Sequence, residues 1–367
     1  MGRAGRPGRS RGVPGARAPG VAGGRRYGAG SRAGATAAGP VCAPARGRQS
    51  LVAMSLRVFR GSFRAMGCEF RVCVAVPDAG TARRAMLAAR SHASHLELLL
   101  SRFREDSELS RLNRSSGSPV RVHPVLWRAL RWALWAARAT GGLYDPTLLD
   151  QLEAAGYGAS FEQLPAAEGL PDPDPAVFGR WRLVRLHRLR PVVFLPPGLR
   201  VDLGGVGKAY AAEQLAAELR RFGPCLVEAG GDVAVRGVPP GWPGWPVAVE
   251  ATGGTLGALW LRRGGLATSG TDVRRWRAGH QVAHHLIDPR TGLPARTDVA
   301  SATVLARHAV EANAHALALV VLGTEAAELY LAHRTRVRAV VVRRDGRLWF
   351  RGLALDRAVR GSQEEVG

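Results

Sequence analysis

The stretch VDLGGVGKAYAAEQLAAEL, residues 201–219, restricts the fold more than any other part of this chain. Its glycines lead directly into a helical pattern, as they do in two common nucleotide-binding motifs. A P-loop requires Gly where this chain has Asp202, and Ser or Thr where it has Ala209. The dinucleotide-binding fingerprint requires a third Gly where the chain has Tyr210. The sequence therefore argues against both of these α/β folds.

The same stretch still has the properties of an anion site. Bare amides at the start of a helix, together with the positive end of the helix dipole, favour a bound phosphate. Lys208 is also the one lysine among 52 Lys and Arg residues. Lysine is a compact point charge on a slim stem, whereas arginine is a planar fork, so the two are not equivalent at a tight site. Chance retention of a last lysine is the alternative.

Helical and extended patterns alternate along the chain without a regular strand–helix–strand repeat. Alternation and β-branched residues predict strands at 70–76, 247–250, 258–262, 299–305 and 337–342. Helical spacing predicts helices over 82–100, over 123–142 with Pro124 in the first turn and Gly141 as the C-cap, over 208–222 ending at Gly223, and over 309–322. Mixed order of this kind is typical of an α+β domain.

The first 53 residues differ in composition from the rest of the chain. They contain ten arginines and no acidic residue, and they are rich in Gly, Ala and Pro, so we expect residues 1–53 to be a disordered tail and 54–360 to form one domain. We find neither a secretory signal nor an apolar run of about 18 residues. The four cysteines fit neither a zinc site nor a disulfide framework. These features predict a cytoplasmic protein with reduced thiols and no transmembrane segment.

Four further polar stretches accompany residues 201–219. They are GLYDPTL (142–148), EAGGDVAVRG (228–237), LATSGT (266–271) and HHLIDPRTGLPA (284–295). Gly-Asp and Asp-Pro pairs are ordinary turn formers, and each stretch alone has that explanation. Five such turns, each ending an apolar run, predict loops that gather around one polar site.

Taken together, these stretches resemble the ApbE family of FAD:protein FMN transferases. The matching segments also include AMGCEF (65–70), SRFREDSELSRLN (101–113) and VEANAHALALVVLG (310–323), and they follow the family's order over about 60–325. The resemblance implies a single α+β flavin transferase domain. It also implies contacts with the flavin or with FAD at Met66, Phe103, Tyr144, Asp145, Asp202, Lys208 and Ile287.

The implied reaction moves the FMN half of FAD onto a Thr or Ser hydroxyl of an acceptor protein and releases AMP. Phosphoryl transfer of this kind needs an anion cradle, a cation and a base near the incoming hydroxyl. The resemblance assigns Mg²⁺ as the cation and the turn with Lys208 as the cradle. His285 matches the histidine of the family's motif, and an imidazole with an ordinary pKa near ~6.5 suits a general base. A turn-capping role is the alternative for His285.

The metal positions depart from the family pattern. The resemblance places the metal at the Gly205 carbonyl and at two side chains, which here are Asn313 instead of Asp and Leu317 instead of Thr. Mg²⁺ prefers hard oxygen ligands, so leucine contributes nothing. Helical geometry directs the neighbouring Glu311 and His315 away from the Asn313 face. The site is therefore weakened, rebuilt or lost.

Three interpretations remain open at this point. The first is an active, Mg²⁺-dependent flavin transferase. The second, which the metal positions favour, is an FAD-binding relative that has lost transfer or only hydrolyses FAD. The third is a nucleic-acid-binding protein, suggested by the net charge of +23 but opposed by isolated basic residues and the absence of a binding motif after residue 53. We expect no specific nucleic-acid partner.

Overall fold

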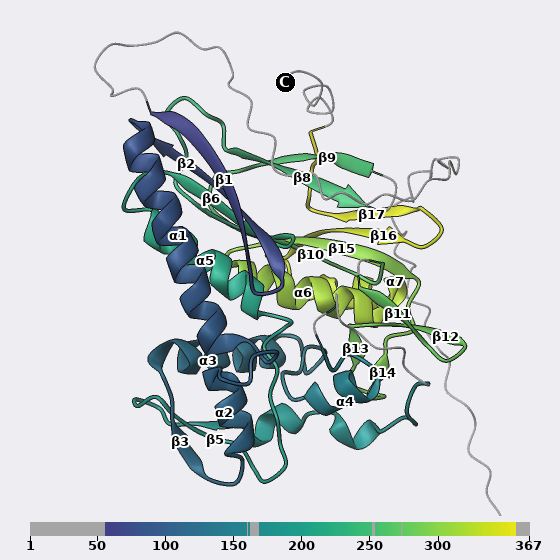
Figure 1. Ribbon diagram of the computed structural model, residues 1–367. Helices are drawn as coiled ribbons and strands as arrows, with labels where there is room; N and C mark the ends of the chain where they lie inside the picture. The colour runs from purple at the N-terminus through teal and green to yellow at the C-terminus, as the bar shows by residue number, and fades with distance from the viewer. Residues whose placement is uncertain (1–55, 160, 162–168, 252–253, 273, 357–367) are drawn as a thin grey trace, which may run out of the picture.

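An eight-stranded sheet forms the centre of the protein. The computed structural model describes residues 56–159, 161, 169–251, 254–272 and 274–356 (Figure 1). The strands lie in the order β1-β2-β6-β7-β10-β15-β16-β17, and every neighbouring pair is antiparallel. Their bounds are β1 (Arg57–Ala65), β2 (Cys68–Val76), β6 (Cys225–Ala229), β7 (Asp232–Arg236), β10 (Gly264–Gly270), β15 (Val299–Ala306), β16 (Arg338–Arg343) and β17 (Leu348–Arg351).

Alternating side chains give this sheet two buried faces. In β2, Phe70 and Val72 pack into the core on the helical side, whereas Cys73 and Ala75 pack into a second core on the other side. Strand side chains alternate between faces, so a strand covered on both sides carries few polar residues. The run VCVAV at the end of β2 has this character, and it is buried throughout.

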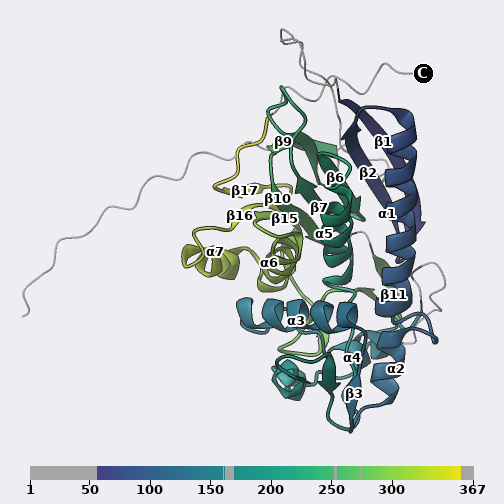
Figure 2. The same cartoon turned by 90° about the vertical axis from the view of Figure 1, so that its left-hand side faces the viewer.

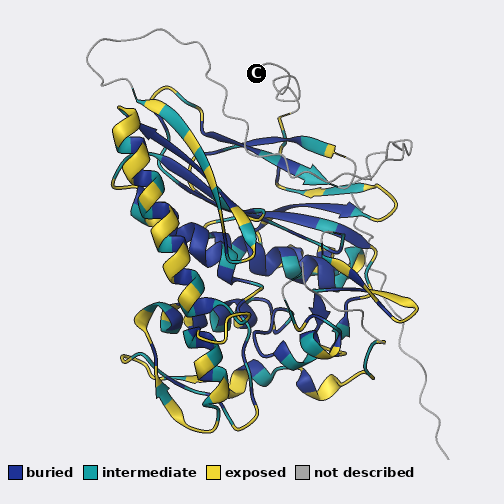
Figure 3. Cartoon of the chain, viewed as in Figure 1, coloured by how far each residue is buried: buried dark blue, intermediate teal, exposed yellow. Residues whose placement is uncertain are grey.

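Different elements cover the two faces. Helices α1 (Ala79–Leu100), α5 (Gly207–Leu219) and α6 (Ala309–Leu322) lie on one face, while the hairpin of β8 (Trp245–Ala251) and β9 (Gly254–Leu261) covers the other (Figures 1 and 2). Helices α5 and α6 are buried almost all round, whereas α1 shows an exposed outer stripe (Figure 3). The sheet and its two coverings form an α+β domain, as the sequence predicts.

Smaller elements lie beyond the end of the helical layer (Figure 1). They are α2 (Glu108–Arg114), α3 (Pro124–Ala139), α4 (Leu149–Ala154), the short 3-10 turns Pro175–Val177 and Arg180–Leu183, and strands β3 (Pro119–Arg121), β4 (Arg185–Leu186), β5 (Val192–Phe194), β11 (Arg275–Ala278), β12 (Gln281–His284), β13 (Ile287–Asp288) and β14 (Leu293–Pro294). Helix α7 (Thr324–Ala332) instead packs beside α6 (Figure 2). Of the polar motifs, 142–148 lies between α3 and α4, and 284–295 contains β13 and β14.

Most predicted elements are confirmed. Helix α6 has the predicted bounds, and α3 begins at Pro124 and is followed by Gly141 at φ 68°. Helix α5 ends at Leu219, not at the predicted Phe222, because i→i+3 hydrogen bonds tighten the chain there. The predicted tail, residues 1–53, lies outside the described residues, so that prediction and the domain bounds stay predictions. In the described part of the chain, no helix combines the length and apolarity needed to cross a bilayer.

Candidate functional site

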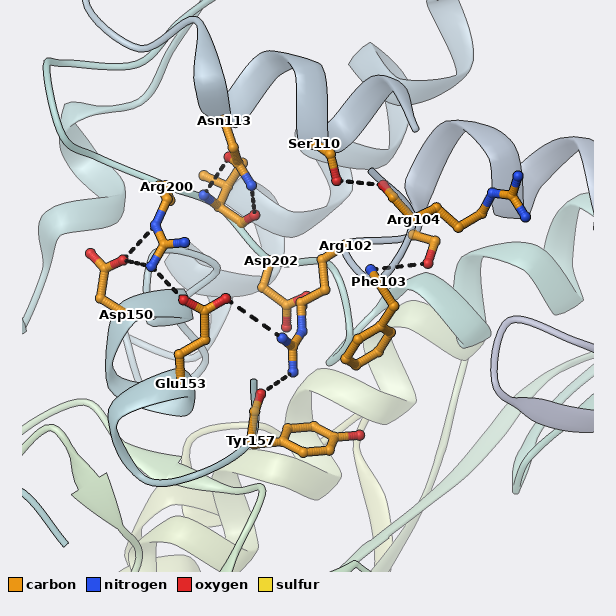
Figure 4. A network of polar contacts seen from close by, with 12 residues as sticks. Arg102, Phe103, Arg104, Ser110, Asn113, Asp150, Glu153, Tyr157, Arg200 and Asp202 are labelled. Carbon is orange, nitrogen blue, oxygen red and sulfur yellow. Dashed lines mark hydrogen bonds and ion pairs between the residues drawn. The ribbon is translucent and has the colours of Figure 1, made fainter. Parts of the chain in front are cut away.

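The glycine-rich turn before α5 is held by contacts from distant parts of the chain. The Asn113 side chain at the end of α2 makes a two-way bond with Val201: its Nδ2 donates to the Val201 carbonyl and its Oδ1 accepts from the Val201 amide, both at 2.9 Å. The Asp202 amide donates to the carbonyl of Pro146 at 2.8 Å. The motif 101–113, whose Asn113 is drawn in Figure 4, and the motif 142–148 therefore fix the backbone where the turn begins.

Gly205 lets an aromatic ring pack directly on this turn. A β-carbon at Gly205 would lie 2.7 Å from Cε2 of Tyr144 and 3.7 Å from Cδ1 of Leu317. A distance of 2.7 Å is too short for two carbon atoms, so a larger residue would displace the ring. Tyr144 and Leu317 thus meet at Gly205, and three positions implied by the resemblance lie together.

Lys208 lies in the first turn of α5, beside the second Gly-Gly turn. A β-carbon on Gly230 would lie 3.4 Å from Cδ of Lys208. Burial lowers the pKa of the Lys208 ammonium, and Arg274 adds to this effect while Asp232 opposes it. The two nearby cations and the helix start make this point attractive to an anion.

Met66 reaches the same helix from the β1–β2 hairpin. It has φ 51°, and Gly67 beside it has φ 66°. Two such residues form the tight hairpin turn whose twist matches the flanking strands, but the left-handed conformation is costly for a side chain with a β-carbon. The Met66 methyl would lie 3.7 Å from a β-carbon at Gly207. The hairpin thus presents an apolar side chain, carried on a strained backbone, to the anion site.

Asp232 and Asn313 form a buried polar pair. Asn313 Nδ2, on α6, donates to Asp232 Oδ1, at the start of β7, at 2.9 Å. Asn313 is 7% exposed and Asp232 is 2% exposed. Burial raises the pKa of Asp232 to about 6, although Lys208 and the Asn313 bond oppose this shift. The second Gly-Gly-Asp motif therefore places a carboxylate beside the residue at the implied metal position.

Two adjacent histidines lie at the end of β12, His284 as its last residue and His285 directly after it, and they differ in their contacts. His284 is buried, its Nε2 bonds the Ala295 carbonyl at 3.0 Å, and its Nδ1 accepts from the Leu286 amide at 3.3 Å. His285 is half-buried, and its Nδ1 has no hydrogen-bond partner among the described residues. Burial, with Arg274 and Lys208, holds the pKa of His285 well below its ordinary value. His285 is therefore neutral at neutral pH, and its role as the base stays a prediction.

Several buried polar atoms in this region have no partner within the described part of the chain. Folded proteins satisfy nearly all buried polar groups, so a cluster of unpaired ones points to a ligand. Oδ2 of Asp145 accepts no hydrogen bond, although its Oδ1 accepts one from the Thr147 amide at 2.8 Å, and burial raises the pKa of this carboxyl. The unpaired atoms are Tyr144 OH, Asp145 Oδ2, Asp232 Oδ2, His285 Nδ1 and Asn313 Oδ1.

Two of the implied flavin-contact residues lie at an adjoining aromatic group. Phe103, between α1 and α2, is 44% exposed, and its ring meets that of Tyr157 edge-on at 5.9 Å. The Tyr157 ring stacks on Trp276 at 5.4 Å. Ile287 is buried in the same hydrophobic cluster as Tyr157 and Trp276, so it helps to hold these two rings in place.

One predicted loop is a strand. Residues 266–270 of LATSGT belong to β10, in the middle of the large sheet, and Thr268 shares a 2.8 Å hydroxyl contact with Thr303 on β15. Threonine suits a pleated strand, and the hydroxyls here pair across strands instead of forming a turn. The prediction of five loops around the site was therefore wrong for this stretch.

Metal ligands are few. In the part of the chain that the structure describes, no three His, Cys, Asp or Glu side chains lie close enough to hold a metal ion together. His315 is turned away from Asn313, as predicted, and its Nδ1 lies 2.6 Å from the Tyr330 hydroxyl. Leu317 packs among apolar side chains. A metal could use only the unpaired oxygens of the Asp232–Asn313 pair and backbone carbonyls.

Sequence reasoning did not single out three of these residues. Asp232 was visible only as part of a turn motif, and Arg274 only as one arginine among many. Cys68 follows the Met66–Gly67 turn, and burial raises the pKa of its thiol to about 11, so it is protonated at neutral pH. The signal that could have found Asp232 is its place directly after two glycines, as in the stretch containing Asp202.

Comparison with known proteins gives one consistent result. A profile described as "ApbE family" matches residues 66–341. The FAD:protein FMN transferase of Salmonella typhimurium is 30% identical over 281 residues, which cover 72% of this chain and 79% of that protein. The protein of the same name from Treponema pallidum is 30% identical over 254 residues, 62% of this chain and 68% of the relative.

Solved structures agree on the fold. The crystal structure of the ApbE protein from Thermotoga maritima superposes with a TM-score of 0.71 and 25% identity, covering 81% of this chain and 97% of that one. The flavin transferase ApbE from Vibrio cholerae gives 0.67 and 22%, covering 80% and 96%.

Proposed function

This chain belongs to the ApbE family, and we propose that it is an FAD:protein FMN transferase. The observation that carries the proposal is the group of unpaired buried polar atoms on Tyr144, Asp145, Asp232, His285 and Asn313, beside Lys208 at the start of a helix. This arrangement suits a large, anionic and hydrogen-bonding ligand such as FAD. The acceptor is a protein with a Thr or Ser site.

The proposed reaction is one displacement at phosphorus. The acceptor hydroxyl oxygen attacks the phosphorus that carries the FMN half, and the bond from that phosphorus to the bridging oxygen breaks, so AMP leaves with the bridging oxygen. The hydroxyl proton passes to Nδ1 of His285, which is unpaired and neutral at neutral pH. A base must be neutral to accept a proton, although a lowered pKa makes it a weaker one.

Each remaining group has a role in binding. Lys208 and the start of α5 hold the diphosphate. Phe103, Met66 and Tyr144 offer apolar and aromatic surface to the flavin ring, with Ile287 behind the aromatic group. Asp145 and Asp202 offer carboxylate acceptors, and ligand N–H or O–H groups are their natural partners.

The residues present fit a magnesium ion in part. Asp232 Oδ2 and Asn313 Oδ1 are buried, unpaired hard oxygens on two residues in contact with each other. Mg²⁺ commonly uses one or two protein oxygens and keeps several waters, so this pair and the Gly205 carbonyl could hold it, while Leu317 could not. When bound, Mg²⁺ would neutralise charge on the diphosphate.

Leucine at position 317 supports a second candidate function, hydrolysis of FAD. A loosely held metal and a site without an acceptor would let water replace the hydroxyl. The products would then be free FMN and AMP. The cytoplasmic location stays a prediction, because the structure bears only on membrane-spanning helices.

The test uses FAD, Mg²⁺ and an acceptor protein that the Salmonella typhimurium relative flavinylates, with that relative as positive control. Flavin fluorescence on the acceptor after denaturing electrophoresis, with one AMP released per flavin attached, supports transfer. AMP with free FMN supports hydrolysis. Both functions would be refuted if the positive control flavinylated the acceptor while this protein, although folded, formed neither flavinylated acceptor nor free FMN.

The two histidines supply a matched pair of variants. His285→Gln should abolish transfer and cost less stability than His284→Gln, because among the described residues its Nδ1 has no partner and its one hydrogen bond is to the Arg274 backbone. His284→Gln breaks two buried hydrogen bonds and should lose about 1–3 kcal/mol of stability. If His284→Gln and His285→Gln lost transfer to the same extent under conditions in which both variants are folded, the proposed role of His285 would be excluded.

A further inference from the structure

Arg102 is a buried arginine that contacts both the glycine-rich turn before α5 and the aromatic group of Phe103 and Tyr157. It lies after the end of α1, and its side chain is only 5% exposed. Its Nη2 donates to the Tyr157 carbonyl at 2.7 Å, its Nε lies 3.4 Å from Asp202 Oδ1, and its Nη1 lies 3.9 Å from Glu153 Oε1 (Figure 4). One guanidinium therefore joins the glycine-rich turn to the end of α4 and the loop after it.

The same guanidinium also touches the aromatic group. Its central carbon lies 4.1 Å from the centroid of the Phe103 ring and 4.8 Å from that of Tyr157. Cations over aromatic faces are held by the ring quadrupole, and the attraction is larger where water is excluded. Arg102 thus fixes the direction of Phe103, the exposed ring at this end of the site, although Arg102 itself is covered.

Charge gives Arg102 a second effect. The Asp202 side chain is 12% exposed and belongs to the glycine-rich turn that leads into α5, whose start is proposed to hold the diphosphate. A poorly solvated carboxylate beside an anion repels it unless a cation offsets its charge. Glu153 has a separate strong partner, since Arg200 Nη2 donates to its Oε2 at 2.6 Å. The Arg102 charge is therefore directed mainly to Asp202.

We propose that Arg102 is a positioning residue for FAD, which offsets the charge of Asp202 and orients Phe103 without touching the substrate. This role rests on the proposed function, since it takes FAD as the ligand. Both effects act on binding, so the property that changes should be the FAD dissociation constant. Lysine can supply the charge but not the planar fork between two rings.

Arg200 provides the matched control. It belongs to the same network, where its Nε donates to Asp150 Oδ1 at 2.6 Å and its Nη2 to Glu153, but no contact joins it to Asp202 or Phe103 within the described residues. Arg102→Gln and Arg200→Gln each remove one guanidinium from this network. We expect Arg102→Gln to raise the FAD dissociation constant about tenfold or more, Arg102→Lys to raise it less, and Arg200→Gln to change it less than about threefold.

A double-mutant cycle with Asp202→Asn separates the charge effect from damage to the fold. If Arg102 offsets the Asp202 charge, Arg102→Gln should weaken FAD binding much less when Asp202→Asn is already present. The double variant buries no unpaired charge, so it should fold even if Arg102→Gln alone does not. Binding is measured by the change in flavin fluorescence, and folding by the melting temperature.

The outcomes are distinct. An Arg102 effect that disappears with Asp202→Asn, and is absent from Arg200→Gln, supports the role. Equal effects of Arg102→Gln with and without Asp202→Asn, or equal effects of Arg102→Gln and Arg200→Gln, would overturn it while leaving the proposed function intact. A folded wild-type protein that bound no FAD would overturn both.

Discussion

Two glycines of one turn should respond in opposite ways to the same substitution. Gly205 and Gly207 differ in what surrounds them, although the sequence offers no means to rank them. A β-carbon at Gly205 would lie 2.7 Å from a ring carbon of Tyr144, whereas one at Gly207 would meet Met66 and Leu203 at 3.7 and 3.8 Å, which are ordinary contact distances. Neither glycine has a positive φ, so backbone strain does not enter.

The magnitudes follow from these contacts. The Tyr144 ring is 4% exposed and its amide is anchored to Thr140 Oγ1 at 3.0 Å, so it cannot move aside cheaply. Overpacking of this kind costs about 1–3 kcal/mol. Gly207 begins α5, where alanine instead of glycine stabilises by about 0.5–1 kcal/mol. We therefore expect Gly205→Ala to be less stable than Gly207→Ala by roughly 1.5–4 kcal/mol.

Urea denaturation of the two variants and the wild type measures this difference directly. Gly205→Ala should also weaken FAD binding, because the displaced ring belongs to a proposed flavin contact. If Gly205→Ala were as stable as Gly207→Ala, the packing of Tyr144 against this turn would be wrong. If it were unstable but bound FAD normally, Tyr144 would be structural only.

Three further predictions concern charge and metal. Lys208→Ala should weaken FAD binding more than Lys208→Arg, and Lys208→Arg should still bind less tightly than wild type; equal binding by all three proteins would show that the lone lysine is incidental. Asn313→Asp with Leu317→Thr should lower the Mg²⁺ concentration needed for transfer, since it adds a carboxylate and a hydroxyl; no change in Mg²⁺ titrations of the folded double variant would place the metal elsewhere. Burial lowers the pKa of His315 to about 4, so the unfolded chain takes up a proton first, and stability should fall by roughly 3 kcal/mol as the pH drops from about 6.5 to 4. His315→Gln should flatten that part of the stability–pH curve, and an unchanged curve would argue against this burial.

The four longest helices and five of the strands follow from local pattern, because their periodicity is strong, whereas the shorter helices and the other strands were not predicted. Helix α6 shows this well: its bounds match the prediction over 309–322. Strand β10 was missed, because Gly and hydroxyl residues in LATSGT are typical of turns, and only pairing with β7 and β15 makes the stretch extended. Local propensity could not reveal partner strands that lie roughly 30 to 40 residues away in the chain.

The site residues also fall into those that the sequence predicts and those that it could not. Tyr144, Gly205 and Leu317 were named from motifs, and the structure brings them together. The contact between Asn313 and Asp232 could not be predicted, since it joins α6 to a strand 81 residues earlier. Arg102 was hidden for another reason. One arginine in an arginine-rich chain carries no signal until its burial is known.

The long spacing of the site residues has a consequence for the protein during synthesis. Met66 comes from the first hairpin and Asn313 from the last helix of the layer, with the sheet order linking β2 directly to β6. Contacts of such high sequence separation form late in folding, and a ribosome must release nearly the whole chain before they can form. A ligand that needs all these segments has no affinity for a partly made chain. It therefore stabilises only finished molecules, and a supply of that ligand would raise the yield of folded protein after, and not during, translation.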